Sequence, residues 1–141
     1  MLSAFYVQNF RSILDLKIDF SYGEGKAPNG YQDQEIIPFI ETNNKKRFVP
    51  CLAFFGANAS GKTNILLAFD VLEDLIVDGL PLGKYFDPNL LNPKFTHTTF
   101  ALEFFIGDDL FTYRIRYNAK EIAEESLSKG KETLFTIQNM E

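Results

Sequence analysis

The residues best suited to chemistry form a short glycine-containing run in the first half of the chain. Gly56, Gly61, Lys62 and Thr63 match the pattern G-x-x-x-x-G-K-[ST], which binds the phosphates of nucleotides. Glycines permit backbone angles that turn successive N–H groups inward, so the loop forms a concave anion site. The ammonium group of Lys62 would pair with the outer phosphates, and the Thr63 hydroxyl would hold Mg²⁺. The pattern therefore predicts a nucleoside triphosphate site with Lys62 as its catalytic residue.

The segments on either side of this loop are those that the pattern requires. Residues 48–55 form an apolar run typical of a buried strand, which also predicts a packed, unreactive thiol for Cys51. A helix is predicted to begin after the loop and to stop near Gly79, with Pro81 enforcing the break. Its apolar positions recur at helical spacing: Ile65, Leu66, Phe69, Leu72, Leu75 and Ile76. Strand, loop and helix together predict the start of a P-loop core.

Composition limits the class of protein. The chain has 141 residues, of which 45% are hydrophobic and 23% charged, as in one ordinary globular domain. Fourteen basic and nineteen acidic residues give a net charge of −5, so bulk charge does not indicate a nucleic-acid surface. A single cysteine excludes an internal disulfide and a cysteine-built metal site. No apolar run approaches about 18 residues, which predicts a cytoplasmic protein without membrane contact.

The first part of the chain predicts a β-hairpin. Residues 1–7 and 13–20 have strand-like patterns, and a turn at 8–12 lies between them. Residues 21–34 are rich in glycine and proline and are predicted to form a surface loop. Residues 35–40 could form a further edge strand, because Pro38 excludes a central position.

The last part of the chain predicts two more hairpins. After an irregular connector at 80–97, strands are expected at 99–106 and 110–117 and again at 121–128 and 132–137. We therefore predict an α/β fold, in which a partial P-loop core carries an antiparallel β-sheet at its side. Residues 1–79 would supply the hairpin, the P-loop strand and the helix, and residues 98–141 the antiparallel region.

Two segments resemble a known family. Residues 9–12, Asn-Phe-Arg-Ser, and residues 56–64, Gly-Ala-Asn-Ala-Ser-Gly-Lys-Thr-Asn, are similar to the start of ABC-type ATPases of the RecF, SMC and OLD kind. The closest resemblance is to prokaryotic AAA-family ATPases with an OLD/RecF-like domain, which often accompany phage-defence and restriction genes. Residues 100–104, 113–115, 125–127 and 132–135 look like the antiparallel β region of these proteins.

The resemblance implies a site and partners. ATP and Mg²⁺ would be the cofactors, Thr63 the magnesium ligand, and two ATP-bound domains would form a head-to-tail homodimer that acts in DNA maintenance or phage defence. Arg11 and Ser12 match the early turn that reaches the nucleotide, although a plain surface-turn role for Arg11 is equally open. The implied nucleotide-binding residues are Arg11, Ser12, Gly56, Ala57, Asn58, Ala59, Ser60, Gly61, Lys62, Thr63 and Asn64.

The chain also departs from the family pattern. The signature serine-glycine motif and the acidic catalytic strand of such proteins come far downstream, and neither occurs before Glu141. We therefore expect an N-terminal lobe that lacks its C-terminal lobe and does not hydrolyse ATP efficiently, because no carboxylate orients the attacking water. One alternative is a non-catalytic interaction module with an empty or phosphate-bound loop. A small kinase or GTPase is a further alternative, but the guanine-reading Asn-Lys-x-Asp element is absent.

Overall fold

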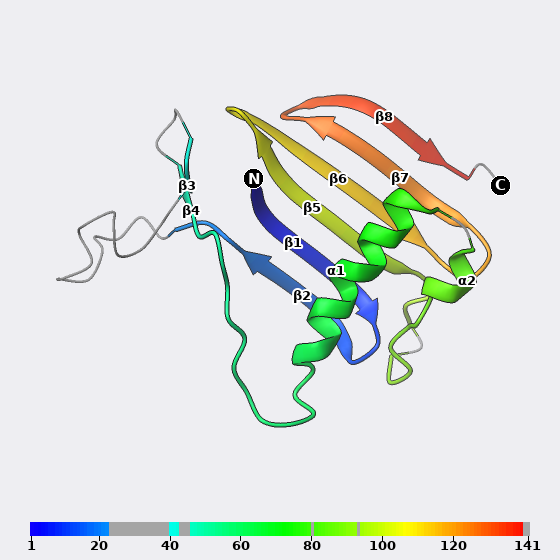
Figure 1. Ribbon diagram of the computed structural model, residues 1–141. Coiled ribbons are helices and arrows are strands. Elements are labelled where there is room, and N and C mark those ends of the chain that lie inside the picture. The colour runs from blue at the N-terminus through cyan, green and yellow to red at the C-terminus, as the bar shows by residue number, and fades with distance from the viewer. Residues whose placement is uncertain (23–39, 43–45, 80, 93, 140–141) are drawn as a thin grey trace.

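The computed structural model describes residues 1–22, 40–42, 46–79, 81–92 and 94–139. Within these residues a six-stranded sheet, in the order β2-β1-β5-β6-β7-β8, is crossed on one face by the helix α1 (Figure 1). The main strands are β1 (Leu2–Phe10), β2 (Ile13–Asp19), β5 (Thr98–Ile106), β6 (Asp109–Tyr117), β7 (Ile122–Lys129) and β8 (Glu132–Gln138). The other elements are β3 (Ile40–Glu41), β4 (Arg47–Phe48), α1 (Lys62–Val77) and α2 (Leu82–Tyr85). β3 and β4 pair with each other as a small two-stranded sheet, and Phe48 of β4 also forms an isolated antiparallel bridge with Ser21.

The three predicted hairpins are confirmed. β1 pairs with β2, β5 with β6, and β7 with β8, each pair antiparallel. Gly107 and Gly130 stand in the tight turns of the last two hairpins with φ angles of 60° and 57°. A left-handed residue in a short hairpin turn matches the twist of the strands, and glycine adopts it without a steric penalty.

The first hairpin and the later strands belong to one sheet, which the sequence did not predict. β1 is antiparallel to β5 as well as to β2, with Val7 opposite Phe100. Phe5, Val7 and Phe100 are fully buried on the face that α1 covers. The described sheet is therefore antiparallel throughout, and it includes the hairpin that was predicted to belong to a separate nucleotide-binding core.

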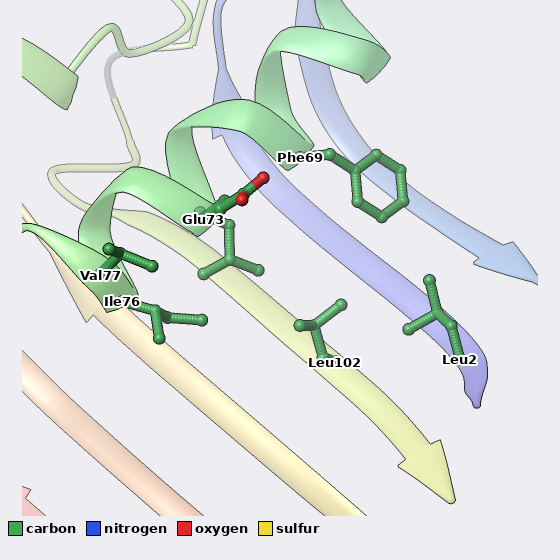
Figure 2. A pocket seen from close by; sticks show the side chains of 7 residues that line it. Leu2, Phe69, Glu73, Ile76, Val77 and Leu102 are labelled. Carbon is green, nitrogen blue, oxygen red and sulfur yellow. The ribbon is translucent and has the colours of Figure 1, made fainter.

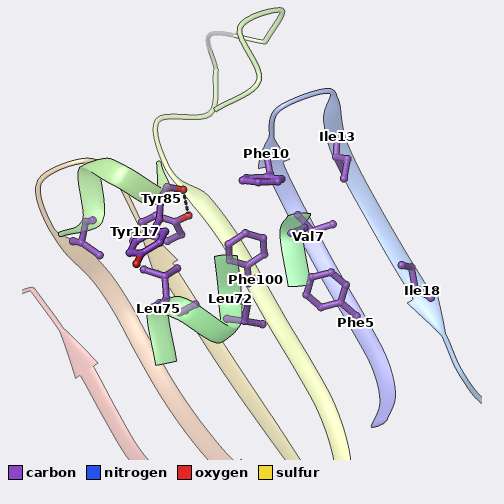
Figure 3. Close-up of a cluster of buried hydrophobic side chains, with 13 residues drawn as sticks. Phe5, Val7, Phe10, Ile13, Ile18, Leu72, Leu75, Tyr85, Phe100 and Tyr117 are labelled. Carbon is purple, nitrogen blue, oxygen red and sulfur yellow. Dashed lines mark hydrogen bonds between the residues drawn. The ribbon is translucent and has the colours of Figure 1, made fainter. Parts of the chain in front are cut away.

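The core lies between α1 and this sheet, as Figure 3 shows. The rings of Phe5 and Phe69 stack with centroids 3.9 Å apart, and Phe100 lies 6.0 Å from Tyr117. Tyr117 is fully buried and donates a hydrogen bond of 2.7 Å from its hydroxyl to the carbonyl oxygen of Tyr85. Burial raises the pKa of Tyr117, so this hydroxyl stays protonated and fastens α2 to the sheet.

The predicted strand at 48–55 is wrong. β4 ends at Phe48, residues 49–60 adopt neither helix nor strand, and residues 51–60 are all exposed. A strand needs a neighbour that pairs with its backbone N–H and C=O groups. The Val49 N–H donates a hydrogen bond of 2.9 Å to the carbonyl oxygen of Phe20, but residues 50–60 pair with no described strand. Cys51 is accordingly an exposed thiol and not the packed one predicted. The α/β P-loop core is thus not confirmed: its loop and helix are present without the strand that should precede them.

Two further predictions concern the middle of the chain. Most of the predicted loop at 21–34 and residues 35–39 of the predicted edge strand lie outside the described residues. The irregular connector at 80–97 is confirmed in the described part, apart from the short helix α2. The division of the chain into 1–79 and 98–141 stays a prediction.

Candidate functional site

The phosphate-loop motif lies at the beginning of α1. The helix starts at Lys62, directly after Gly61, whose φ of 90° requires a residue without a Cβ atom. A Cβ atom at Gly61 would also lie 3.1 Å from Ser12 Oγ. Ala59 is left-handed as well, with φ of 63°. The loop thus curls tightly into a helix N-terminus, where unpaired N–H groups and the helix dipole favour an anion.

The side chain of Lys62 folds back into this loop. Its Nζ donates hydrogen bonds to the carbonyl oxygens of Gly56 and Ala57, at 2.8 and 2.6 Å, and to Ser60 Oγ at 3.2 Å. A lysine ammonium group has three donors, and these three acceptors use them all. Phosphate oxygens would therefore have to replace carbonyl oxygens as the partners of Lys62 when a nucleotide binds.

The β1–β2 turn contacts the first turn of α1. Asn64 Nδ2 donates to Ser12 Oγ at 2.6 Å, and Arg11 Nη1 donates to Asn64 Oδ1 at 3.3 Å. Two groups of predicted site residues that are far apart in the sequence thus lie side by side. Asn64 uses both ends of its amide in these contacts, which makes it a bridge between the turn and the helix.

Sequence reasoning assigned no role to two residues that hold this turn. Asp87 Oδ2 lies 2.6 Å from Arg11 Nε, in an ion pair that is about half exposed. Asn9 is fully buried with φ of 57°, and its side chain bonds to the backbone of the connector. The signals in the sequence were an asparagine at a turn, where left-handed angles are tolerated, and a connector that contains Asp87 and the asparagines Asn89 and Asn92.

Thr63 is exposed in the first turn of α1, beside the loop. Its hydroxyl is a hard oxygen ligand that suits Mg²⁺ together with phosphate oxygens. Among the described residues no three His, Cys, Asp or Glu side chains cluster so that they could hold a metal ion. Magnesium would accordingly depend on Thr63 and the nucleotide itself. Ala57 and Asn58 lie exposed in the same loop.

Two cavities formed by described residues lie elsewhere and have a different character. One of about 310 Å³ lies between the later turns of α1 and the sheet, among Leu2, Phe69 and Leu102, with Glu73 as its one charged group (Figure 2). A second, of about 570 Å³, opens between the end of α1 and β5–β8. Neither presents the converging hydrogen-bond donors that a polyphosphate needs, so we place the candidate nucleotide site at the loop.

The comparisons with known proteins identify a family for most of the chain. A family model described as "AAA domain, putative AbiEii toxin, Type IV TA system" matches residues 51–136. The chain belongs to this family. No curated protein matches the chain. The matched range of the AAA domain includes the phosphate loop, all of α1 and most of the later strands, whereas β1 and β2 lie outside it.

Membership makes the chain a P-loop, AAA-type nucleotide-binding domain. Domains of this type generally bind ATP with Mg²⁺, through the lysine and the hydroxyl residue of the loop. In the described part of this AAA domain, no helix is long and apolar enough to cross a membrane.

Proposed function

We propose that this domain is the ATP-binding N-terminal lobe of an OLD/RecF-like ATPase. Residues 56–64, with Arg11 and Ser12, would bind Mg-ATP, Lys62 would pair with the β- and γ-phosphates, and Thr63 would hold the metal ion. The observation that carries the proposal is the hydrogen bond of 2.6 Å between Ser12 Oγ and Asn64 Nδ2. It brings the Asn-Phe-Arg-Ser turn to the loop, as the resemblance to OLD, RecF and SMC proteins leads one to expect.

The biological role follows from the same resemblance. Nucleotide occupancy would drive two copies together head to tail and move an attached effector, in cytoplasmic DNA maintenance or phage defence. Any DNA contact would be made by the full-length protein, because this chain carries a net charge of −5. The 141-residue chain alone would bind ATP without efficient hydrolysis.

The experiment is a calorimetric titration of the chain with Mg-ATP beside the variant Lys62→Ala. We expect binding that the variant loses, because the ammonium group is the loop's own positive charge. Lys129→Ala is the matched control: this lysine pairs with Asp109 at the β5–β6 and β7–β8 turns, and its removal should leave binding unchanged. Equal binding by the wild type and Lys62→Ala would overturn the proposal.

Two observations favour a second candidate, a non-catalytic interaction module. The loop carbonyl oxygens of Gly56 and Ala57 point at Lys62, and Phe55 before the loop is 92% exposed. In this alternative the loop stays closed on its lysine or holds only inorganic phosphate, and the apolar segment contacts another protein. Absence of Mg-ATP binding by the wild type, with a folded chain, would favour this candidate.

A further inference from the structure

Asp87 lies outside every motif in the sequence, yet it contacts Arg11 twice. Its carboxylate Oδ2 lies 2.6 Å from Arg11 Nε, and its backbone carbonyl accepts a hydrogen bond of 2.7 Å from the Arg11 N–H. The first contact orients the guanidinium group, and the second fixes the main chain that carries it. Together with the contact from Arg11 to Asn64, they determine where the arginine lies relative to α1.

The connector that carries Asp87 is itself fastened to the β1–β2 turn. Asn9 Oδ1 accepts a hydrogen bond of 2.9 Å from the N–H of Asn89, and Asn9 Nδ2 donates to the carbonyl oxygens of Phe95 and His97 at 3.2 and 2.9 Å. Asn9 is fully buried and only two residues from Arg11. Turn and connector therefore form one closed unit, in which Asp87 cannot move independently of Arg11.

The backbone of this turn needs such support. Asn9 and Arg11 both have positive φ angles, 57° and 51°, which residues other than glycine rarely adopt. Residues other than glycine keep left-handed backbone angles only where surrounding contacts hold that conformation, and such residues cluster at ligand sites. The contacts that hold Arg11 in this conformation are those from Asp87 and Asn64.

The guanidinium group still has donors to offer. Its described hydrogen bonds use Nε and Nη1, which leaves Nη2 without a protein acceptor in the described part of the chain. Arginine presents its N–H groups in a planar fork that suits phosphate oxygens, and orienting the fork beforehand reduces the entropy lost on binding. We propose that Asp87 is a positioning residue, which holds Arg11 beside the first turn of α1 to receive the phosphates of the nucleotide. This inference rests on the function proposed above.

The test is a double-mutant cycle on Mg-ATP affinity, with Arg11→Ala, Asp87→Ala and the double variant in the full chain. Arg11→Ala should weaken binding about tenfold, as expected for the loss of a charge-assisted hydrogen bond. Asp87→Ala should weaken it about two- to fivefold, the range of a half-exposed ion pair. The double variant should bind no more weakly than Arg11→Ala, because Asp87 acts through the arginine.

Two further variants keep the test sharp. Asp109→Ala removes a carboxylate of the same exposure from an ion pair of 2.7 Å with Lys129, in the sheet, and should leave affinity unchanged. Asp87→Asn keeps an acceptor for Arg11 Nε without the charge, so its affinity should lie between those of the wild type and Asp87→Ala. It also serves if Asp87→Ala does not fold, as judged by circular dichroism.

The outcomes separate the inference from the function on which it rests. Equal weakening by Asp87→Ala in the wild-type and Arg11→Ala backgrounds would give Asp87 a purely structural role and overturn the inference. Tighter binding by Asp87→Ala would overturn it too, because the carboxylate would then compete with the nucleotide for Arg11. If the wild type binds Mg-ATP and Lys62→Ala does not, these results concern Asp87 alone. A wild type that does not bind overturns both proposals.

Discussion

The sheet with α1 and the segment before the phosphate loop both carry large apolar side chains in sequence but are opposite in structure. Phe100 in β5 is fully buried between the rings of Phe5, Phe10 and Tyr117, whereas Phe55 is 92% exposed. The difference is the presence of a neighbour: each sheet strand pairs with another strand of this chain, whereas residues 50–60 pair with no described strand. Apolar composition therefore makes a strand only where a partner satisfies the backbone.

The largest expected difference between the two regions is in the free energy of unfolding after one phenylalanine in each is replaced by alanine. Phe100→Ala should lower the free energy of unfolding by about 3–5 kcal/mol, because it leaves a cavity among three aromatic rings. Phe55→Ala should change it by less than about 0.5 kcal/mol. Urea denaturation of both variants measures the difference, and similar losses would mean that residues 49–60 are packed in solution.

A smaller effect should come from the turn that joins the sheet to the site. Asn9→Ala removes the partners of the Asn89 N–H and the His97 carbonyl, and an unpaired buried group costs about 1–3 kcal/mol. Asn92→Ala is the matched control in the same connector, since Asn92 makes one local bond to the N–H of Lys94. We expect the midpoint temperature of thermal unfolding to fall clearly for Asn9→Ala and little for Asn92→Ala. Equal falls would show that Asn9 does not hold the connector.

The smallest effect should be a pH dependence at the start of β5. Burial lowers the pKa of His97 below its ordinary value of 6.5, Arg116 lowers it further, and Glu121 opposes them. The unfolded chain then binds a proton more readily than the folded one, so the free energy of unfolding should fall as pH drops below about 6.5. His97→Gln should lose this part of the dependence, measured by denaturation between pH 5 and pH 8. An identical pH profile in the variant would contradict the assignment.

Local patterns predicted most of the fold correctly. The three hairpins follow from alternating strands around glycine turns, and α1 from the helical spacing of residues such as Phe69 and Leu72. The pairing of β1 with β5 could not be predicted, because no local signal specifies which strands become neighbours. The prediction of a strand at 48–55 was wrong for a related reason: an apolar run does not indicate whether another strand will pair with it.

The candidate site also has parts that local sequence predicts and parts that it does not. The loop and Lys62 could be predicted because the chemistry of phosphate binding constrains consecutive residues. Arg11 and Ser12 came from resemblance, and the structure brings their turn to Asn64. Asp87 was not found because its contact with Arg11 exists only after the connector folds back on β1, and an aspartate before a proline carries no such information in sequence.

The pairing of β1 with β5 has a consequence for how the chain folds. Val7 pairs with Phe100, so β1 and β5 close a loop that contains α1 and the connector. Closing long loops is entropically costly, and folds built on distant pairings form slowly. During synthesis the first hairpin must wait for β5, with one edge of β1 open to strands of other chains. The step that completes the sheet is then also the step that brings Arg11 and Asp87 together.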